Sequence, residues 1–252
     1  MQRSKTGIQG LDKALNGGFP EGNLVLLSGG AGTGKSTISL QYLVNGATLY
    51  GEKGLYISTE QSEEELQKSA SQFGWNLVDL ENRNLLRIIF FKVLEEDHFL
   101  TKIEELVKTF QPKRIVIDSM TTLTDSLMLG ELQKDKAFSM INIVDTVSPI
   151  QRTEQIVTKI ILYNVLNKFK EFGTTVIFTS ELHEGDVGFS TDGVSEFIVD
   201  GVVTLHFLEG TKFRTLKVRK MRYTDHGFHT LDYIITSKGI ELQESTDLVN
   251  KL

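Results

Sequence analysis

A glycine-rich run that ends in lysine and serine is the strongest chemical signal in this chain. The run Gly29-Gly30-Ala31-Gly32-Thr33-Gly34-Lys35-Ser36 fits the pattern G-x-x-x-x-G-K-[ST]. Glycines at this spacing let the backbone approach a phosphate and point N–H groups at it, and a following helix adds its positive N-terminal dipole. The pattern predicts that Lys35 reaches the β- and γ-phosphates of a nucleotide and that Ser36 ligates Mg²⁺. The alternative is a glycine-rich turn with an incidental lysine.

A carboxylate ends a second apolar run. The run Arg114–Asp118, RIVID, predicts a buried strand whose last residue is an acid. Because ligands of parallel sheets bind at the C-terminal ends of the strands, Asp118 fits the second acid of a magnesium site. Taken alone, an aspartate at a strand end is a turn or cap residue, so this interpretation depends on the phosphate loop.

Glu60 follows another expected strand, Leu55–Thr59. It should project from the same sheet edge as the phosphate loop, where a carboxylate can polarise the water that attacks the γ-phosphate. The alternative is a solvent-exposed acid in a loop.

Two cations end a strand near the other end of the chain. Period two in the expected strand Phe213–Met221 predicts that Lys220 and Arg222 continue the core-facing row of Leu216 and Val218. A basic strand end commonly keeps a sheet edge solvated. It also suits an arginine finger directed at a nucleotide on a neighbouring molecule, because this strand lies far along the chain from the loop.

These residues must be positioned by alternating strands and helices. Short apolar runs alternate with segments of helical period, which is typical of βαβ units around a parallel sheet. The expected strands are Leu24–Ser28, Leu55–Thr59, Leu85–Phe91, Arg114–Asp118 and Thr174–Thr179. One expected helix begins at Lys35, a second covers Ser62–Phe73 with a capping box from Ser62 and Glu65, and a third covers Asp97–Phe110. A fourth, long helix follows Pro149 and ends at Gly173.

Beyond Val199 the pattern changes to strands joined by short turns. The runs are Val202–Leu208, Phe213–Met221 and Phe228–Ile235, with a turn at Glu209-Gly210-Thr211 between the first two. The fold class is therefore α/β, with a mostly parallel twisted sheet, flanking helices and C-terminal antiparallel strands. No linker or repeat interrupts the pattern, so we expect a single domain over residues 1–252, with 242–252 as a candidate flexible tail.

Composition excludes several classes of protein. The chain has 252 residues, 40% of them hydrophobic, and 27 Lys+Arg against 33 Asp+Glu give a formal charge of 27 − 33 = −6. The absence of cysteine excludes disulfides, thiolate zinc sites, iron–sulfur clusters and a cysteine nucleophile. No window approaches 18 uncharged apolar residues. We expect a cytoplasmic protein that does not enter a membrane.

The constellation resembles the KaiC and RadA/RecA branch of P-loop ATPases along almost the whole chain. Residues 6–12, TGIQGLD, and 17–22, GGFPEG, look like the family's lead-in to the phosphate loop at 29–37. Residues 220–226, KMRYTDH, are similar to the family's K-(M/L)-R-x-T-x-H. Together these segments are far more specific than the phosphate loop alone.

The resemblance implies a RecA-like P-loop NTPase core that assembles as a homo-oligomeric ring, usually a hexamer, with ATP and Mg²⁺ at each subunit interface. It assigns Glu60 as the catalytic glutamate and Asp118, with Ser36, to the metal. It implies that Lys220, Arg222 and His226 reach the neighbour's nucleotide, Lys220 and Arg222 as catalytic groups beside Lys35. The nucleotide would lie on Gly29, Ala31, Gly32, Thr33, Gly34, Lys35, Ser36 and Thr37.

The sequence departs from the family pattern at two positions. Clock-type relatives carry paired glutamates where this chain has Glu60-Gln61, which leaves Glu60 as the sole candidate base. Tyr223 replaces the glycine common after K-x-R, as in some archaeal RadA paralogues, which favours that type. The length accommodates one module rather than the two of a clock protein, and nothing supports carrying over autophosphorylation sites.

Two segments would line the centre of such a ring, and both are poor in cations. The segment 124–153 holds Asp125, Glu131, Asp135 and Asp145 against Lys134, Lys136 and Arg152, and 183–197 holds Glu184, Asp186, Asp192 and Glu196 with no Lys or Arg. Since phosphate neutralisation dominates non-specific affinity, such a pore should bind DNA poorly. Our first hypothesis is an ATP-driven ring read by a protein partner. The alternatives are a RadA-paralogue repair protein that binds single-stranded DNA, and a nucleotide sensor that barely hydrolyses ATP.

Overall fold

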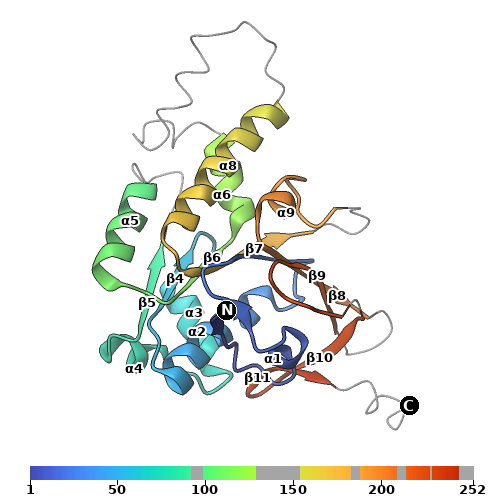
Figure 1. Ribbon diagram of the computed structural model, residues 1–252. Helices are drawn as coiled ribbons and strands as arrows, with labels where there is room; N and C mark the ends of the chain where they lie inside the picture. The colour runs from blue at the N-terminus through green and yellow to red at the C-terminus, as the bar shows by residue number, and fades with distance from the viewer. Residues whose placement is uncertain (92–98, 129–153, 183–187, 209–213, 228, 244–252) are drawn as a thin grey trace, which may run out of the picture.

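A nine-stranded sheet with helices on both faces forms the described part of the chain (Figure 1). This computed structural model describes residues 1–91, 99–128, 154–182, 188–208, 214–227 and 229–243. The strand order is β11-β10-β9-β8-β3-β7-β6-β4-β5. The six strands from β8 to β5 run parallel to one another, and β9, β10 and β11 extend the sheet from β8 in antiparallel pairs. The predicted fold class is confirmed.

The strands follow the apolar runs of the sequence. Their bounds are β3 Leu24–Gly29, β4 Gly54–Ser58, β5 Leu86–Phe90, β6 Arg114–Asp118, β7 Thr175–Glu181, β8 Gly201–Phe207, β9 Arg214–Met221, β10 Leu231–Thr236 and β11 Gly239–Gln243. A separate pair, β1 Arg3–Ser4 and β2 Phe19–Pro20, belongs to the N-terminal segment. Leu242 is buried in β11, so it belongs to the sheet rather than to the expected tail.

The helices fill the connections between the strands. They are α1 Leu11–Ala14, α2 Lys35–Tyr50, α3 Glu63–Ser71, α4 Leu77–Asn82, α5 Phe99–Phe110, α6 Met120–Met128, α8 Glu154–Glu171 and α9 Ser195–Ile198. The capping box at the start of α3 is present, because Ser62 accepts from the Glu65 N–H and Glu65 accepts from the Ser62 N–H. The expected helix starts at 97 and 149 and the turn at 209–211 lie outside the described residues.

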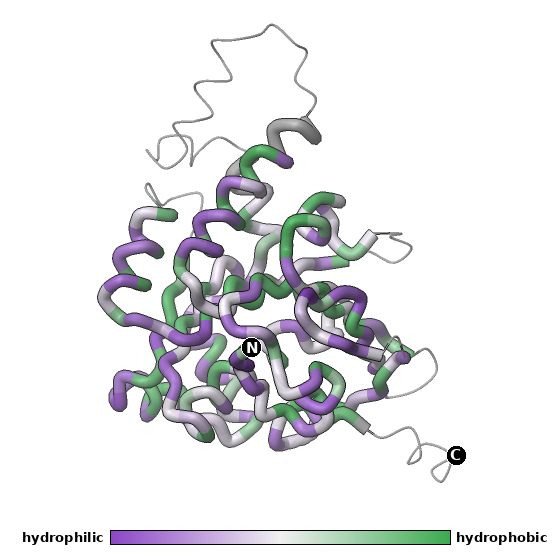
Figure 2. The backbone as a smooth tube through the Cα atoms, viewed as in Figure 1, coloured by the Kyte–Doolittle hydropathy of each residue, from purple (hydrophilic) through white to green (hydrophobic). Residues whose placement is uncertain are grey.

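Two apolar clusters, one on each face, hold the layers together. In the first cluster, the helices α1, α2, α3 and α4 pack against one face of the sheet, and Val25, Tyr56 and Val116 are among the strand residues of the cluster. The second joins α5, α6 and α8 to the other face. Hydrophobic colour concentrates in the strands at the middle of the molecule, while hydrophobic and hydrophilic residues alternate along the helices (Figure 2). Burial of both faces explains why the parallel strands read as continuous apolar runs.

Of the helices in these described ranges, none is long and apolar enough to cross a membrane.

Candidate functional site

The glycine-rich loop connects the central strand β3 to α2, as its sequence predicts. Gly32 and Gly34 have φ values of 75° and 97°, a left-handed conformation that residues with a Cβ rarely adopt. A Cβ at Gly29 would lie 2.7 Å from the carbonyl oxygen of Leu205. Glycine is therefore required at these positions, and the loop wraps tightly around the start of the helix.

Lys35, the first residue of α2, folds back over this loop. Its Nζ donates to the carbonyl oxygens of Gly29 (2.8 Å) and Gly30 (3.1 Å). Burial lowers the pKa of the Lys35 ammonium, while the charges of Glu181, Asp118 and Glu60 act in the opposite direction. The ammonium thus lies near acids that belong to the ends of three neighbouring strands.

Asp118 is buried at the end of β6, and hydroxyl groups from the two adjacent strands hold its carboxylate. Tyr56 Oη donates to Oδ2 at 2.5 Å, and Thr179 Oγ1 donates to Oδ1. Burial and the adjacent Asp118 charge raise the pKa of Tyr56 well above its usual value. The phenol therefore stays protonated and remains a donor. The Ser36 side chain also interacts with Tyr56, which brings both predicted metal residues to one place.

The donor set of this place suits Mg²⁺. A hydroxyl oxygen from Ser36 and a carboxylate oxygen from Asp118 are hard oxygen ligands, and protein-bound Mg²⁺ commonly uses one or two carboxylates together with substrate phosphates. The residues with described side chains contain no group of three or more His, Asp or Glu that could bind a metal without help.

Glu60 lies beside Asp118, just after β4. Its Oε1 accepts hydrogen bonds from Ser119 Oγ and from Thr122 Oγ1, the latter at 2.8 Å. Ser119 follows Asp118 directly, and its N–H donates to Thr59 Oγ1 at 2.9 Å. These bonds hold an exposed carboxylate at the edge of the sheet where the sequence predicts it.

The structure adds residues that sequence reasoning missed. Arg214 Nε donates to the Gly32 carbonyl at 3.3 Å, and its guanidinium lies 5.2 Å from the centre of the Phe207 ring. Phe207 is 52% exposed although it borders the loop. Tyr233 Oη donates to the Thr33 carbonyl at 2.5 Å. These residues come from β8, β9 and β10, and no local motif marks them.

The predicted face of Lys220 and Arg222 is wrong, and a β-bulge is the reason. Val203 pairs with Val218, but Val202 pairs with Lys220, so one extra residue of β9 interrupts the alternation. Leu216 and Val218 lie in the core with α2, whereas Lys220 Nζ donates to three carbonyl oxygens at α9 on the opposite face, those of Glu196 (3.1 Å), Phe197 (3.3 Å) and Val199 (2.6 Å).

These cations also lie at the edge of the sheet remote from the loop. Met221 pairs with Gly201, which pairs with Val25 near the start of β3. The loop begins four residues further along β3, so roughly 13 Å of strand separates the two places. Arg222 Nη1 pairs with Asp200 at 2.9 Å. His226 follows β9 in the same segment, and its Nδ1 lies 3.3 Å from the Gly227 carbonyl.

The expected pore segments are described only in part, because residues 129–153 and 183–187 lie outside the described ranges. In the second segment, Asp192 accepts from the N–H groups of Val194 (2.7 Å) and Ser195 (2.6 Å). Glu196 accepts from Ser190 Oγ at 2.6 Å. These acids therefore stabilise the loop itself.

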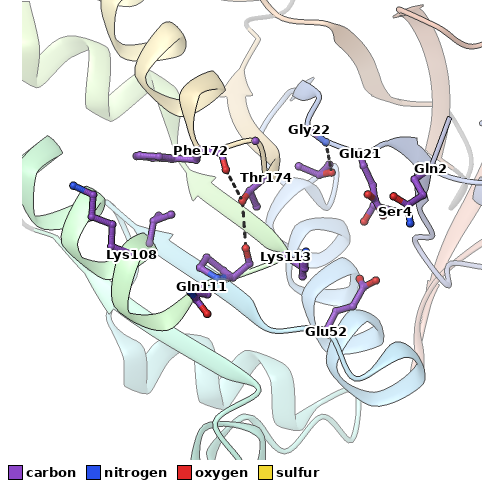
Figure 3. Close-up of a pocket in the computed structure, with 14 residues that line it drawn as sticks. Gln2, Ser4, Glu21, Gly22, Glu52, Lys108, Gln111, Lys113, Phe172 and Thr174 are labelled. Carbon is purple, nitrogen blue, oxygen red and sulfur yellow. Dashed lines mark hydrogen bonds between the residues drawn. The ribbon is translucent and has the colours of Figure 1, made fainter.

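A cavity of about 840 Å³ lies elsewhere, where the strands begin. In Figure 3, Lys108 and Phe172 stand on one side of it and Glu21 and Glu52 on the other. Glu52 is the counterion of the buried Arg114, at 2.6 Å. Since parallel sheets bind nucleotides at the C-terminal ends of their strands, this cavity is distinct from the loop site despite its volume.

Comparisons with known proteins agree with this geometry. The family model described as "ATPase: KaiC" matches residues 4–135 and 126–247. A UPF0273 protein of Pyrococcus furiosus is 32% identical over 243 residues, covering 95% of this chain and 93% of its own. A UPF0273 protein of Thermotoga maritima is 33% identical over 251 residues, covering 97% of each chain.

Two further matches carry the name KaiC. The circadian clock oscillator protein KaiC of Prochlorococcus marinus is 29% identical over 252 residues, which cover 95% of this chain but 45% of that protein. The crystal structure of a KaiC-like protein of Pyrococcus horikoshii superposes with a TM-score of 0.77 at 32% identity, covering 96% of this chain and 99% of the other. The chain belongs to the KaiC family of ATPases.

Proposed function

We propose that the chain binds ATP with Mg²⁺ on the loop Gly29–Thr37 and hydrolyses it, within a ring of identical subunits whose nucleotide state is read by a protein partner. The observation that carries the proposal is the convergence of Lys35, Ser36, Asp118 and Glu60 at one sheet edge. Lysine, hydroxyl and two acids are the groups that phosphoryl transfer from a nucleotide requires.

The loop residues divide the chemistry between them. The amides of Gly29, Ala31, Gly32, Thr33, Gly34 and Thr37 cradle the phosphates, and Lys35 exchanges its two carbonyl partners for phosphate oxygens. Ser36 and Asp118 would hold Mg²⁺, and the ion would supply positive charge to stabilise the transferring phosphoryl group. Glu60, fixed by Ser119 and Thr122, orients the attacking water and accepts its proton.

Lys220, Arg222 and His226 act on the nucleotide of the next subunit. Their distance from their own loop, about 13 Å of strand, supports this assignment, because they cannot reach a nucleotide bound to the same chain. A closed ring, which we take to be a hexamer, provides every loop with a neighbour. The exposed Phe197 (71%) and Tyr223 (69%) lie in the same region and suit a surface that a second subunit covers.

The test measures solution mass with and without ATP and Mg²⁺, beside phosphate release from the same sample. We expect a ring mass that ATP with Mg²⁺ stabilises, together with phosphate release that disappears in Lys35→Ala. A protein that releases phosphate but stays monomeric would contradict the assignment of Lys220 and Arg222. A protein that binds no ATP would overturn the proposal as a whole.

The alternative, a RadA-paralogue repair protein on single-stranded DNA, has its own measurement. Anisotropy titration with single-stranded DNA at low and physiological salt should give weak binding if a protein partner is the target. Submicromolar binding with a steep salt slope would instead establish the DNA-binding alternative, because that slope counts released counterions.

A further inference from the structure

Tyr56 donates a hydrogen bond to Asp118, one of the two groups assigned to Mg²⁺, and its hydroxyl lies near the other, Ser36. The side chain is fully buried on β4, on the sheet face that packs against α2. Its register partner on β6 is Val116, so Asp118 occupies the diagonal position two residues on. Long aromatic side chains can span such a diagonal. The phenol reaches Asp118 Oδ2 at 2.5 Å and also interacts with the Ser36 side chain.

Thr179 holds the other oxygen of the same carboxylate. Phe178 pairs with Ile117, which places Thr179 next to Asp118 on the neighbouring strand β7. Its Oγ1 donates to Oδ1, while Tyr56 donates to Oδ2. Each carboxylate oxygen has two lone pairs, so one donor on each oxygen fixes the plane of the group and leaves a lone pair on each oxygen for a metal ion.

We propose that Tyr56 is a positioning residue of the magnesium site: its hydroxyl sets the Asp118 carboxylate and the Ser36 hydroxyl relative to each other and thereby determines the affinity for Mg²⁺. The inference rests on the proposed function of the loop. Partners that orient metal ligands contribute strongly, since their loss typically lowers metal affinity or activity about 10–100-fold.

A second tyrosine provides a matched control. Tyr42 is also fully buried, and its hydroxyl bonds to Ser4 Oγ at 2.7 Å, near the N-terminal β1–β2 pair. Its ring contacts Phe19 with a centroid distance of 5.7 Å. Tyr56→Phe and Tyr42→Phe each remove one buried hydroxyl and keep the ring, but only the first touches Asp118 and Ser36.

The experiment separates nucleotide binding from metal binding. Calorimetry measures ATP affinity in EDTA and at a series of Mg²⁺ concentrations, and electron paramagnetic resonance follows Mn²⁺ bound in the presence of ADP. We expect Tyr56→Phe to bind ATP in EDTA with the wild-type affinity and to bind Mn²⁺ more weakly than the wild type. Half of the increase in ATP affinity that Mg²⁺ produces should require about ten times more Mg²⁺ in the variant than in the wild type. Tyr42→Phe should match the wild type in every measurement.

Thr179 supplies an independent pair of variants. Thr179→Val should reproduce the loss of metal affinity, and Thr179→Ser, which keeps a hydroxyl, should restore it. If Tyr56→Phe keeps the wild-type dependence on Mg²⁺ and Mn²⁺, the inference is overturned and the proposed function stands. If ATP gains no affinity from Mg²⁺ in the wild type, both the inference and the magnesium role of Ser36 and Asp118 are overturned.

Discussion

Asp200 and Arg222 form an ion pair of 2.9 Å that connects the proposed finger to the strand carrying the phosphate loop. Asp200 Oδ1 accepts from Arg222, while Oδ2 accepts from the N–H of Leu24, the first residue of β3, at 3.1 Å. The Arg222 N–H also donates to the Asp200 carbonyl at 2.9 Å. The cation that we assign to one nucleotide is therefore anchored to the strand that positions another. In the proposed ring, this ion pair would link one nucleotide site to the next.

The first prediction concerns Arg222 itself. Arg222→Ala should lower kcat about 10³-fold or more, as for other arginine fingers, and leave ATP affinity of the same subunit nearly unchanged. Mixing with Lys35→Ala should restore phosphate release, because a Lys35→Ala subunit still supplies its Arg222 to the intact loop of an Arg222→Ala neighbour. The measurement is steady-state phosphate release across mixing ratios.

Lys217→Ala serves as the control for Arg222. Lys217 is a partly exposed cation on the same strand β9, and it is not assigned to the nucleotide. The Lys217→Ala variant should therefore hydrolyse ATP at the wild-type rate. Unchanged turnover in Arg222→Ala would contradict the finger assignment.

The second prediction concerns the stability that Asp200 contributes. Asp200 is 2% exposed, and Lys170 contacts it at 3.1 Å in addition to Arg222. Asp200→Asn keeps a hydrogen-bond acceptor for Leu24 but removes the charge that both cations face. We expect the free energy of unfolding to fall by about 2 kcal/mol, the range of hydrogen bonds to charged groups, as measured by urea denaturation.

A surface pair provides the comparison. Asp79 and Arg83 form an ion pair at 3.3 Å whose side chains are 53% and 56% exposed. Asp79→Asn should leave the free energy of unfolding nearly unchanged, because exposed pairs contribute little. If the free energy of unfolding fell equally in Asp200→Asn and Asp79→Asn, burial of Asp200 would not increase the contribution of its ion pairs to stability.

The third prediction tests hydrolysis separately from binding. Glu60→Gln keeps an acceptor for Ser119 and Thr122 but cannot take a proton, so we expect kcat to fall about 10²–10⁴-fold with ATP affinity preserved. Glu64→Gln, at an exposed acid in the first turn of α3, should behave as the wild type. Turnover that survives in Glu60→Gln would exclude Glu60 as the base, and a wild type that binds without hydrolysing would identify a nucleotide sensor.

Much of this architecture was predictable because it depends on short stretches of sequence. Local spacing predicts a glycine-rich loop after a strand, a helix that begins at Lys35 and a strand that ends at Asp118, and the structure confirms these three elements. The capping box of Ser62 and Glu65 is equally local. Parallel strands then bring Glu60 and Asp118 to one edge, since both follow the C-terminal ends of strands in the same sheet.

The remainder depends on register between distant strands. The contact of Tyr56 with Asp118 follows from the pairing of β4 with β6, and sequence periodicity does not encode that pairing. The extra residue in β9 reverses the face of Lys220, and a strict period of two cannot anticipate it. Phe207 and Arg214 reach Gly32 only because β8 lies beside β3, an adjacency set by the whole sheet.

The last prediction concerns the base of the nucleotide. The exposed Phe207 ring lies 3.5 Å from where a Cβ on Gly32 would be, and Arg214 stacks against it, so the pair offers an aromatic and cationic platform beside the loop. Because stacking of a base on an aromatic side chain contributes about 1–3 kcal/mol, Phe207→Ala should raise the Kd for ATP roughly ten-fold or more. The Kd for inorganic tripolyphosphate, which has no base, should not change. Tyr163→Ala, at an aromatic residue that is 55% exposed on α8, controls for the loss of a surface ring. Calorimetry with both ligands decides the matter, because equal weakening for ATP and tripolyphosphate would mean that Phe207 supports the loop rather than the base.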